Sequence, residues 1–512
     1  MEFSSILSVL TLCLVSSIEG ARILSIFSTP TKSHSILAIK LAEGLIKRGH
    51  HVTLASPYMF EPQENLTHLH LKSIHEYKEK KLNNSDKLSS LFFMMQRIVT
   101  LTTAINELFW EEPNIQKLIT EKPKYDAVIL MTFFNDGILG IGHHLGVPTV
   151  IFNNVGTFSL WNNYVANPTM PYSQDPLFSI PTDNFFGRLT TVTGNLLLGA
   201  MSIYQIDSVN QALLNKYLPT SPPLRVLQKN VSIVLANSHV SIEPARPYVP
   251  NMIQIGGFHV QETKPLPADI KRFLDDAKEG AILFSLGSNL KVEMMEEQKR
   301  KDIFKVLGEL SPMRVVIKSE MAYEGVASNI MMKSWLPQAD ILGHPNIKLF
   351  VSHGGLGGNI ESIYHGVPIL GIPFYGDQLM NMHEAQVAGY AKILHPQDIT
   401  EDLFRHTLKE MLNNPKYQQI AKIRSALMRE QPVKPMDTAA FWIEHIIKFG
   451  GGSHLKNAGA DLEWYQLYMV DIYVFYTVVV SSLTVLIIQL IKIFLRLLKR
   501  VFVKSNPKVK KS

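Results

Sequence analysis

Four closely spaced glycines, Gly354, Gly355, Gly357 and Gly358, constrain this chain more than any other feature. They follow the strand-like run Lys348–Val351 and precede a helix-compatible stretch that begins near Asn359. A strand, a glycine turn and a helix N-terminus form an anion site. The turn lets the backbone approach a phosphate, and unpaired helix N–H groups point at it. The local sequence therefore predicts a phosphate-binding turn at the end of a strand.

Strand-like and helix-like segments alternate along the chain in two series, separated by a Pro-rich stretch at 244–267. The expected strands are Arg22–Phe27, His51–Ala55, Asp126–Met131 and Thr149–Asn153 in the first series, and Ala281–Leu286, Arg314–Lys318, Lys348–Val351 and Pro368–Ile372 in the second. Helices are expected over Ile36–Arg48 and from about Gly137 to Leu145. At 512 residues the chain is too long for one core. We therefore expect an α/β fold with two doubly wound, Rossmann-like domains.

Two apolar segments bear on where the protein resides. Residues 3–18 are apolar and end in small residues near a plausible cleavage point, which is typical of a signal peptide. Residues Ile472–Ile491 form an apolar run interrupted only by Thr, Ser and Gln489. Twenty residues at about 1.5 Å each span the hydrocarbon core of a bilayer. We expect a transmembrane helix there, with a buried core helix as the alternative.

The basic C-terminal tail accounts for most of the net charge of +6, because many Lys and Arg residues and no acid follow Ile491. This local excess makes a nucleic-acid partner a weak interpretation. The positive-inside rule places the tail in the cytoplasm and the body of the protein in the lumen. The final Lys508-Val-Lys510-Lys511-Ser512 resembles a dilysine endoplasmic-reticulum retrieval signal. Binding of a basic tail to anionic membrane lipid is the alternative.

Cysteine and sequon positions fit a lumenal protein. The only cysteine, Cys13, lies in the expected signal peptide, so the mature chain would have no disulfide. Sequons begin at Asn65, Asn83 and Asn230, and we expect one or two to be glycosylated. Two apolar stretches, 91–109 and 185–203, could be core helices, an acceptor pocket or a face resting on the bilayer.

One ordered set of residues resembles the donor-binding signature of the UDP-glycosyltransferase family, in its membrane-bound, insect-like animal branch. The set is Trp335, Gln338, His353-Gly-Gly355, Glu361 and Asp377-Gln378. The segments Ile282–Ser288, Ile255-Gly256-Gly257 and His454 to Gln466 widen the likeness. The resemblance implies the GT-B arrangement, in which two Rossmann-like domains face across a cleft, with a C-terminal transmembrane helix. The implied division is 1–20 signal peptide, 21–250 acceptor-binding domain, 251–435 UDP-sugar-binding domain, 436–470 C-terminal helices and membrane-proximal segment, 471–493 transmembrane helix and 494–512 cytoplasmic tail.

The resemblance also implies roles on the donor side. Trp335 would stack on uracil, Gln338 would bond the base or ribose, and Glu361 would accept hydrogen bonds from the ribose hydroxyls. His353 and Ser288 would contact the diphosphate together with the backbone at Gly355, Gly357 and Gly358. Asp377 and Gln378 would hold the sugar hydroxyls. Relatives often have Asn where this chain has Gly357, and Asn359 lies two places later.

The acceptor half must supply the catalytic base. His34 follows the first expected strand and begins the first expected helix, at the sheet edge where ligands bind, and its position matches the family's catalytic histidine. A histidine base works better with a carboxylate on its other nitrogen. Relatives usually carry an acid directly after the strand 126–130, but this chain has Met131 and Thr132. We therefore expect Asp136 to be the partner of His34, with a helix N-cap as its alternative role.

No metal motif accompanies this site in the sequence. The chain lacks Asp-x-Asp, and His143-His144 would point in different directions on a helix. We expect no cofactor and no metal, with a UDP-sugar as co-substrate. The expected activity is inverting transfer of a hexose, with glucose as the expected sugar, to a hydroxyl of a small lipophilic acceptor. Glucuronate as the donor sugar and a UDP-sugar-binding protein with little turnover remain alternatives, and a homo-oligomer stays open.

Overall fold

The computed structural model describes residues 20–82, 91–156, 159–170, 184–288, 290–321 and 323–504. The chain forms two compact units, which meet between Asn457 and Ala458. Several predictions fall outside the described residues: nearly all of the expected signal peptide with Cys13, the sequon at Asn83, and the end of the basic tail beyond Lys504.

Seven parallel strands form the first sheet, in the order β3-β2-β1-β4-β5-β6-β7. Their bounds are β1 Arg22–Ile26, β2 His51–Ser56, β3 Leu66–His70, β4 Ala127–Leu130, β5 Thr149–Asn153, β6 Ile233–Ala236 and β7 Met252–Gln254. The order reverses at β1, where Ile23 faces Val52 of β2 on one side and Ala127 of β4 on the other. Such a switch point opens a crevice at the carboxyl ends of the strands, so the loop after β1 is placed to meet a ligand.

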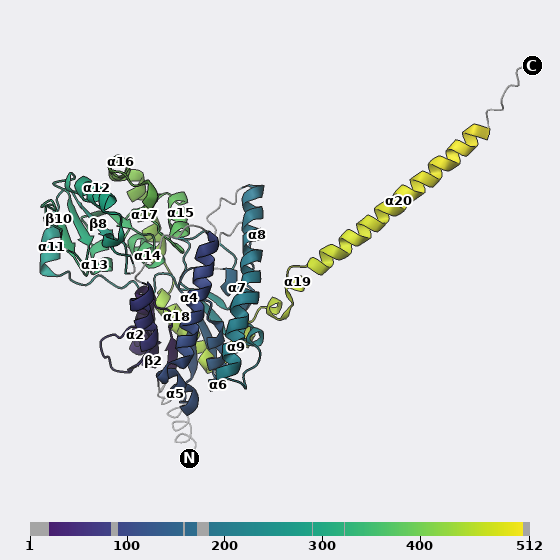
Figure 1. The fold of residues 1–512 in the computed structure, drawn as a ribbon, viewed down its shortest axis with the longest axis horizontal. Coiled ribbons are helices and arrows are strands. Elements are labelled where there is room, and N and C mark those ends of the chain that lie inside the picture. The colour runs from purple at the N-terminus through teal and green to yellow at the C-terminus, as the bar shows by residue number, and fades with distance from the viewer. Residues whose placement is uncertain are drawn as a thin grey trace, which may run out of the picture. The chain divides into compact units, whose positions relative to one another are not determined.

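Helices cover both faces of this first sheet (Figure 1). They are α2 Lys32–Lys47, α3 Lys72–Tyr77, α4 Leu91–Glu111, α5 Pro113–Glu121, α6 Leu139–Leu145, α7 Ser159–Val165, α8 Phe185–Met201, α9 Ser208–Tyr217 and α10 Leu224–Lys229. Successive residues of β1 alternate between two cores. Ile23 packs in the core that α2 completes, and Leu24 packs in the core that contains Phe109 of α4.

The two apolar stretches of the first domain differ in exposure. The first is α4, whose Phe109 and Trp110 are fully buried, so its C-terminal part is a core helix. The second is α8, which leaves Phe186, Leu196 and Leu197 about two-thirds or more exposed.

Six parallel strands form the second sheet, in the order β10-β9-β8-β11-β12-β13. They are β8 Ala281–Ser285, β9 Arg314–Lys318, β10 Ile330–Lys333, β11 Ile347–Ser352, β12 Ile369–Gly371 and β13 Ala391–Ile393. The accompanying helices are α11 Ala268–Asp275, α12 Glu297–Gly308, α13 Gln338–Leu342, α14 Leu356–Tyr364, α15 Gln378–Val387, α16 Glu401–Asn413 and α17 Pro415–Arg429. Here the order reverses between β8 and β11, which brings the loops after these two strands together.

The structure changes the expected division of the chain in two places. β7 pairs with β6 in the first sheet, so the first domain extends beyond the expected boundary at 250. α18 (Pro435–Lys448) was expected in a separate C-terminal segment but packs on the first domain (Figure 1). Its Ala439, Ala440 and Ile443 are fully buried in the core that α2 shares. The chain passes from the first sheet to the second within the Pro-rich stretch, but composition alone does not show that β7, inside this stretch, still pairs with the first sheet.

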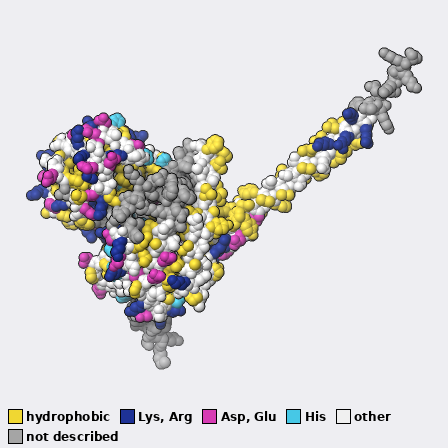
Figure 2. Space-filling model, in the orientation of Figure 1, with side chains coloured by type: hydrophobic (Ala, Val, Ile, Leu, Met, Phe, Trp, Pro, Cys, Tyr) yellow, Lys and Arg dark blue, Asp and Glu magenta, His cyan; other side chains and the backbone are white. Residues whose placement is uncertain are grey.

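The second unit consists of short helical turns, α19 (Trp464–Leu467) and the long helix α20 (Val470–Lys504). α20 has one membrane-span candidate, Val470–Val501, which contains the expected span 471–493 and is not buried by other parts of the protein. Figure 2 shows apolar side chains along most of α20 and basic ones towards its C-terminal end. The length and composition of this helix agree with a single membrane crossing.

Candidate active site

The glycine turn joins β11 to α14 in the arrangement that the sequence predicts. Gly354 has φ of 84°, in the left-handed region that favours glycine, and its N–H donates to the Ser352 hydroxyl over 3.2 Å. Gly355 is the N-cap of α14 and has no side chain to cap the helix, while the Asp377 carboxylate interacts with the Leu356 N–H in the first turn. A Cβ on Gly357 would meet nothing within 4 Å. The glycine turn therefore leaves open space at the N-terminus of α14, which suits an anion.

His353 is held between two glycines. A Cβ on Gly287, in the turn after β8, would lie 2.5 Å from the His353 ring, and one on Gly355 would lie 2.6 Å from it. Ser288 follows Gly287 and is partly exposed in the same turn. Burial, with a smaller contribution from Lys318, lowers the pKa of His353 to about 4. The ring is neutral at physiological pH, and its buried Nδ1 has no hydrogen-bond partner among the described residues. These features fit a group that contacts a diphosphate.

Lys318 is a site residue that the sequence analysis missed. It ends β9, and its Nζ donates to the Gly287 carbonyl oxygen over 2.7 Å. Burial lowers its pKa, and Lys32 at the start of α2 lowers it further. Lys318 thus braces the turn that carries Ser288 and places positive charge near His353. The sequence signal that could have found Lys318 is a lysine directly after the apolar run Val315–Ile317, at the carboxyl end of β9.

The residues expected to bind the nucleoside lie together. Trp335 leaves 66% of its surface exposed, and such an exposed indole face can stack on a base. Gln338 begins α13, and its Nε2 donates to the Glu361 carboxylate on α14 over 2.7 Å. Burial raises the pKa of Glu361 to about 7, while the bond from Gln338 lowers it. The two side chains form one polar edge beside the glycine turn.

Asp377 and Gln378 lie at the start of α15. The Asp377 carboxylate accepts from Asn381 over 2.7 Å, and burial raises its pKa. The amide oxygen of Gln378 accepts from the backbone N–H groups of Phe374 and Tyr375, so this side chain braces the loop after β12. Asn359 faces the core, where its Oδ1 accepts from the Tyr390 hydroxyl over 3.1 Å. It therefore does not replace the asparagine that relatives carry in place of Gly357.

His34 is the third residue of α2, at the carboxyl edge of the first sheet. Its Nδ1 lies 2.8 Å from Oγ1 of Thr29, in the loop after β1. Burial lowers the pKa of His34 to about 4. The imidazole is therefore neutral at physiological pH, which is the protonation state that a general base needs. A helix N-terminus also disfavours the imidazolium.

The expected pair of His34 and Asp136 is not formed. The Asp136 carboxylate accepts from the Tyr164 hydroxyl over 2.8 Å and from Gln228 over 2.7 Å. Burial raises the pKa of Asp136. Asp136 also begins a short 3-10 helix, and Asn135, not Asp136, is its N-cap. The prediction failed because the loop after β4 directs the Asp136 side chain towards α7 and α10.

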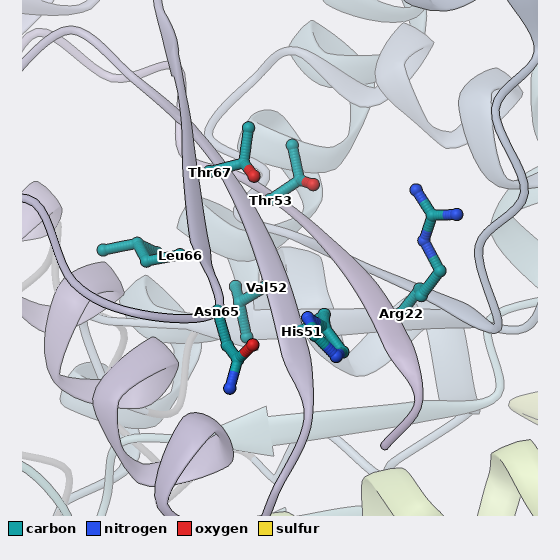
Figure 3. Close-up of a pocket in the computed structure, with 7 residues that line it drawn as sticks. All are labelled: Arg22, His51, Val52, Thr53, Asn65, Leu66 and Thr67. Atoms are coloured by element: carbon teal, nitrogen blue, oxygen red, sulfur yellow. The ribbon is translucent and has the colours of Figure 1, made fainter. Parts of the chain in front are cut away.

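Other predicted positions are also visible. Asn65, with φ of 61°, lines a pocket with Arg22 and His51 at the amino ends of the first strands (Figure 3). Ligands of parallel sheets bind at the opposite edge, so this pocket is no part of the candidate active site. Asn230 is exposed at the C-cap of α10. In the described part of the chain no group of three or more His, Cys, Asp or Glu is arranged to hold a metal ion.

Two doubly wound domains with loops gathered at the carboxyl ends of their strands form the GT-B fold. Solved structures of that fold agree. The calicheamicin glycosyltransferase CalG4 superposes with a TM-score of 0.60 at 16% identity, over 84% of this chain and 99% of that one. The glycosyltransferase VinC in complex with dTDP gives a TM-score of 0.56 at 15% identity, over 84% of this chain and all of that one.

Residues 26–508 match the family described as UDP-glucoronosyl and UDP-glucosyl transferase. UDP-glycosyltransferase UGT5 of Dactylopius coccus is 32% identical over 93% of this chain and 92% of its own length. UDP-glucuronosyltransferase 2A3 of Mus musculus is 29% identical over 93% of this chain and 92% of its own length. The chain therefore belongs to the UDP-glycosyltransferase family, and it is an enzyme that transfers a sugar from a UDP-sugar donor to an acceptor.

Proposed function

We propose that the enzyme transfers a hexose, with glucose as the leading candidate, from its UDP-sugar to a hydroxyl of a small lipophilic acceptor, inverting the anomeric centre. The observation that supports the displacement is one chain with both a glycine turn at the N-terminus of α14 and a neutral histidine at the start of α2. The acceptor oxygen would attack the anomeric carbon while His34 takes its proton. The bond from that carbon to the diphosphate breaks, and UDP leaves.

The donor residues would act by position and electrostatics. His353, Ser288 and the N–H groups at Gly355 to Gly358 would receive the charge that develops on the diphosphate. Uncapped helix N–H groups can stabilise such charge without a metal ion. Trp335, Gln338 and Glu361 would hold the nucleoside, while Asp377 and Gln378 would meet the sugar.

Glucose leads because a relative named UDP-glucosyltransferase 2 of Dactylopius coccus is 32% identical over 93% of this chain. Glucuronate is the second candidate, because mammalian relatives are named UDP-glucuronosyltransferases. We further propose a single-pass type I protein of the endoplasmic reticulum membrane with lumenal catalytic domains. The exposed apolar helix α20 and the basic residues that end it support this topology.

The test is UDP release by the full-length enzyme, with UDP-glucose and UDP-glucuronate, over a panel of phenolic and aliphatic acceptors. His34→Ala should lower turnover by about 10²- to 10⁴-fold, because general-base catalysis contributes that factor. UDP affinity, measured by calorimetry, should stay unchanged. His51→Ala is the matched control, since exposed His51 lies at the opposite edge of the sheet. Retention of more than about a third of turnover by His34→Ala would remove His34 as the base.

A low-turnover UDP-sugar-binding protein is the second candidate function, favoured by one observation: His34 has no carboxylate partner among the described residues. The same panel separates the two candidates. Tight UDP-sugar binding without UDP release above background, across all acceptors, would favour the binding protein.

A further inference from the structure

The first position after β4, where the family resemblance leads us to expect an acid, is occupied by a core side chain. Met131 directly follows β4 and is fully buried. It belongs to the same apolar cluster as Leu37 and Ala38, which follow His34 along α2. The position therefore faces α2, but a thioether can neither orient nor neutralise an imidazole there.

The polar residues next to Met131 are committed elsewhere. Asn135 donates to the Ser28 hydroxyl over 2.9 Å and accepts from the Phe133 N–H over 2.6 Å. Asp136 is bonded to Tyr164 and Gln228. Burial lowers the pKa of His34, and neither Asn135 nor Asp136 forms a hydrogen bond with its ring.

Thr29 is the side chain that does reach the ring. Its Oγ1 lies 2.8 Å from Nδ1 of His34, and Thr29 is only 7% exposed, so water competes little for this contact. Three hydrogen bonds hold the segment from Ser28 to His34 in place. The Asn135 amide holds Ser28, the His34 N–H donates to the Thr31 carbonyl oxygen over 3.1 Å, and the Tyr58 hydroxyl donates to the Pro30 carbonyl oxygen over 3.2 Å.

We propose that Thr29 is the positioning residue of His34, in place of the carboxylate partner that the sequence led us to expect; this rests on the proposed function of His34 as the base. A base must present a lone pair on Nε2, so Nδ1 must carry the proton. The Thr29 hydroxyl oxygen accepts that N–H, which selects the active tautomer and fixes the ring. A hydroxyl bears no charge, so it orients the imidazolium without neutralising it.

The test compares variants of the full-length enzyme at saturating donor and acceptor. Thr29→Val removes the oxygen and keeps the branched shape. We expect kcat to fall about 3- to 10-fold, the factor that one neutral hydrogen bond is worth, with KM and UDP affinity unchanged. Thr29→Ser keeps the hydroxyl and should retain wild-type kcat. Thr31→Val is the matched control, because Thr31 precedes α2 and its side chain makes no capping bond.

Several results would overturn the assignment. Thr29→Ser as slow as Thr29→Val would mean that the methyl group matters through packing. Thr29→Val with full kcat, beside an inactive His34→Ala, would remove Thr29 and leave the base intact. An active His34→Ala would instead overturn the proposed base itself. Thr29→Ala, which also lacks the hydroxyl, provides the comparison if Thr29→Val fails to fold.

Discussion

At the scale of single residues, two histidines share one electrostatic state and would serve different tasks. His34 and His353 both have a pKa lowered to about 4 by burial. His34 has its Nδ1 beside Thr29, whereas the His353 ring lies against Gly287 and Gly355. Neutrality matters most for His34, because a general base must accept a proton.

A carboxylate placed at Met131 should change the first of these histidines. Met131→Asp would put an acid where the family resemblance leads us to expect one, and a nearby opposite charge raises a histidine pKa by roughly 1–3 units. We expect the acid limb of the kcat profile to move to higher pH and the folded state to lose stability, since Met131 is fully buried. Met131→Asn is the control of equal size. Identical pH–rate profiles of the two variants would show that position 131 does not reach His34.

Glu361 should make donor binding depend on pH. Its pKa is raised to about 7 by burial, so at pH 6 most of the carboxyl is protonated and at pH 8 most is ionised. The ionised form accepts stronger hydrogen bonds from ribose hydroxyls. UDP-glucose affinity should therefore rise between pH 6 and pH 8, and Glu361→Gln should abolish the rise. Calorimetry at several pH values is the measurement, and a flat wild-type profile would contradict the ribose contact.

Two contacts around β11 and α14 follow from short spacings in the sequence, although the donor-binding roles of these residues stay predictions. Glu361 and Gln338 do meet, and Gly355 does leave room for His353. The partner of His34 could not be predicted, because it depends on the path of two loops. The path of segment 132–136 places the Asp136 carboxylate beside Tyr164. The five-residue loop between β1 and α2 places Thr29 beside Nδ1 of His34.

At the scale of elements, α14 has a glycine, Gly357, at the position where the family resemblance leads us to expect an asparagine. Gly357 occupies its first turn, and a Cβ there would be free of contacts. Gly357→Asn should therefore fit without strain and add one hydrogen bond to the diphosphate, tightening UDP about 3- to 10-fold. Gly355→Ala is the contrasting variant and should weaken UDP, since its Cβ would press on His353. Unchanged or weaker UDP affinity in Gly357→Asn would place the diphosphate elsewhere.

Central strands were the predictable elements. The runs at 149–153 and 314–318 match β5 and β9 to the residue, because buried parallel strands read as continuous apolar segments. The sequence analysis did not predict β3, β6, β7, β10 or β13. Four of these are edge strands that are short or partly exposed, whereas β6 is an inner, fully buried strand of only four residues. Edge strands have a weaker hydrophobic pattern, so whether such a segment forms a strand depends on the neighbouring strand with which it pairs.

At the scale of the whole molecule, the membrane helix and the catalytic unit should separate cleanly. Deleting residues 470–512 removes α20, which no other part of the protein buries. The shortened protein should no longer resist carbonate extraction, yet keep its thermal unfolding midpoint and UDP affinity. A protein ending at residue 434 is the contrasting case. It also loses α18, whose buried Ala439 and Ile443 complete a core, and should not fold. Continued membrane retention of the first truncation would reveal a second inserting segment.

The return of α18 to the first domain has a consequence for how such enzymes can diversify. The chain leaves the first sheet after β7, builds the whole donor domain, and comes back to pack beside α2. In addition, Arg48 forms an ion pair with Glu444 over 2.7 Å, which ties the returning helix to the end of α2. The donor domain is thus an insertion with both ends anchored on one body. Recombination between relatives could exchange that insertion as a cassette, giving a new donor preference to an existing acceptor pocket without remaking either core.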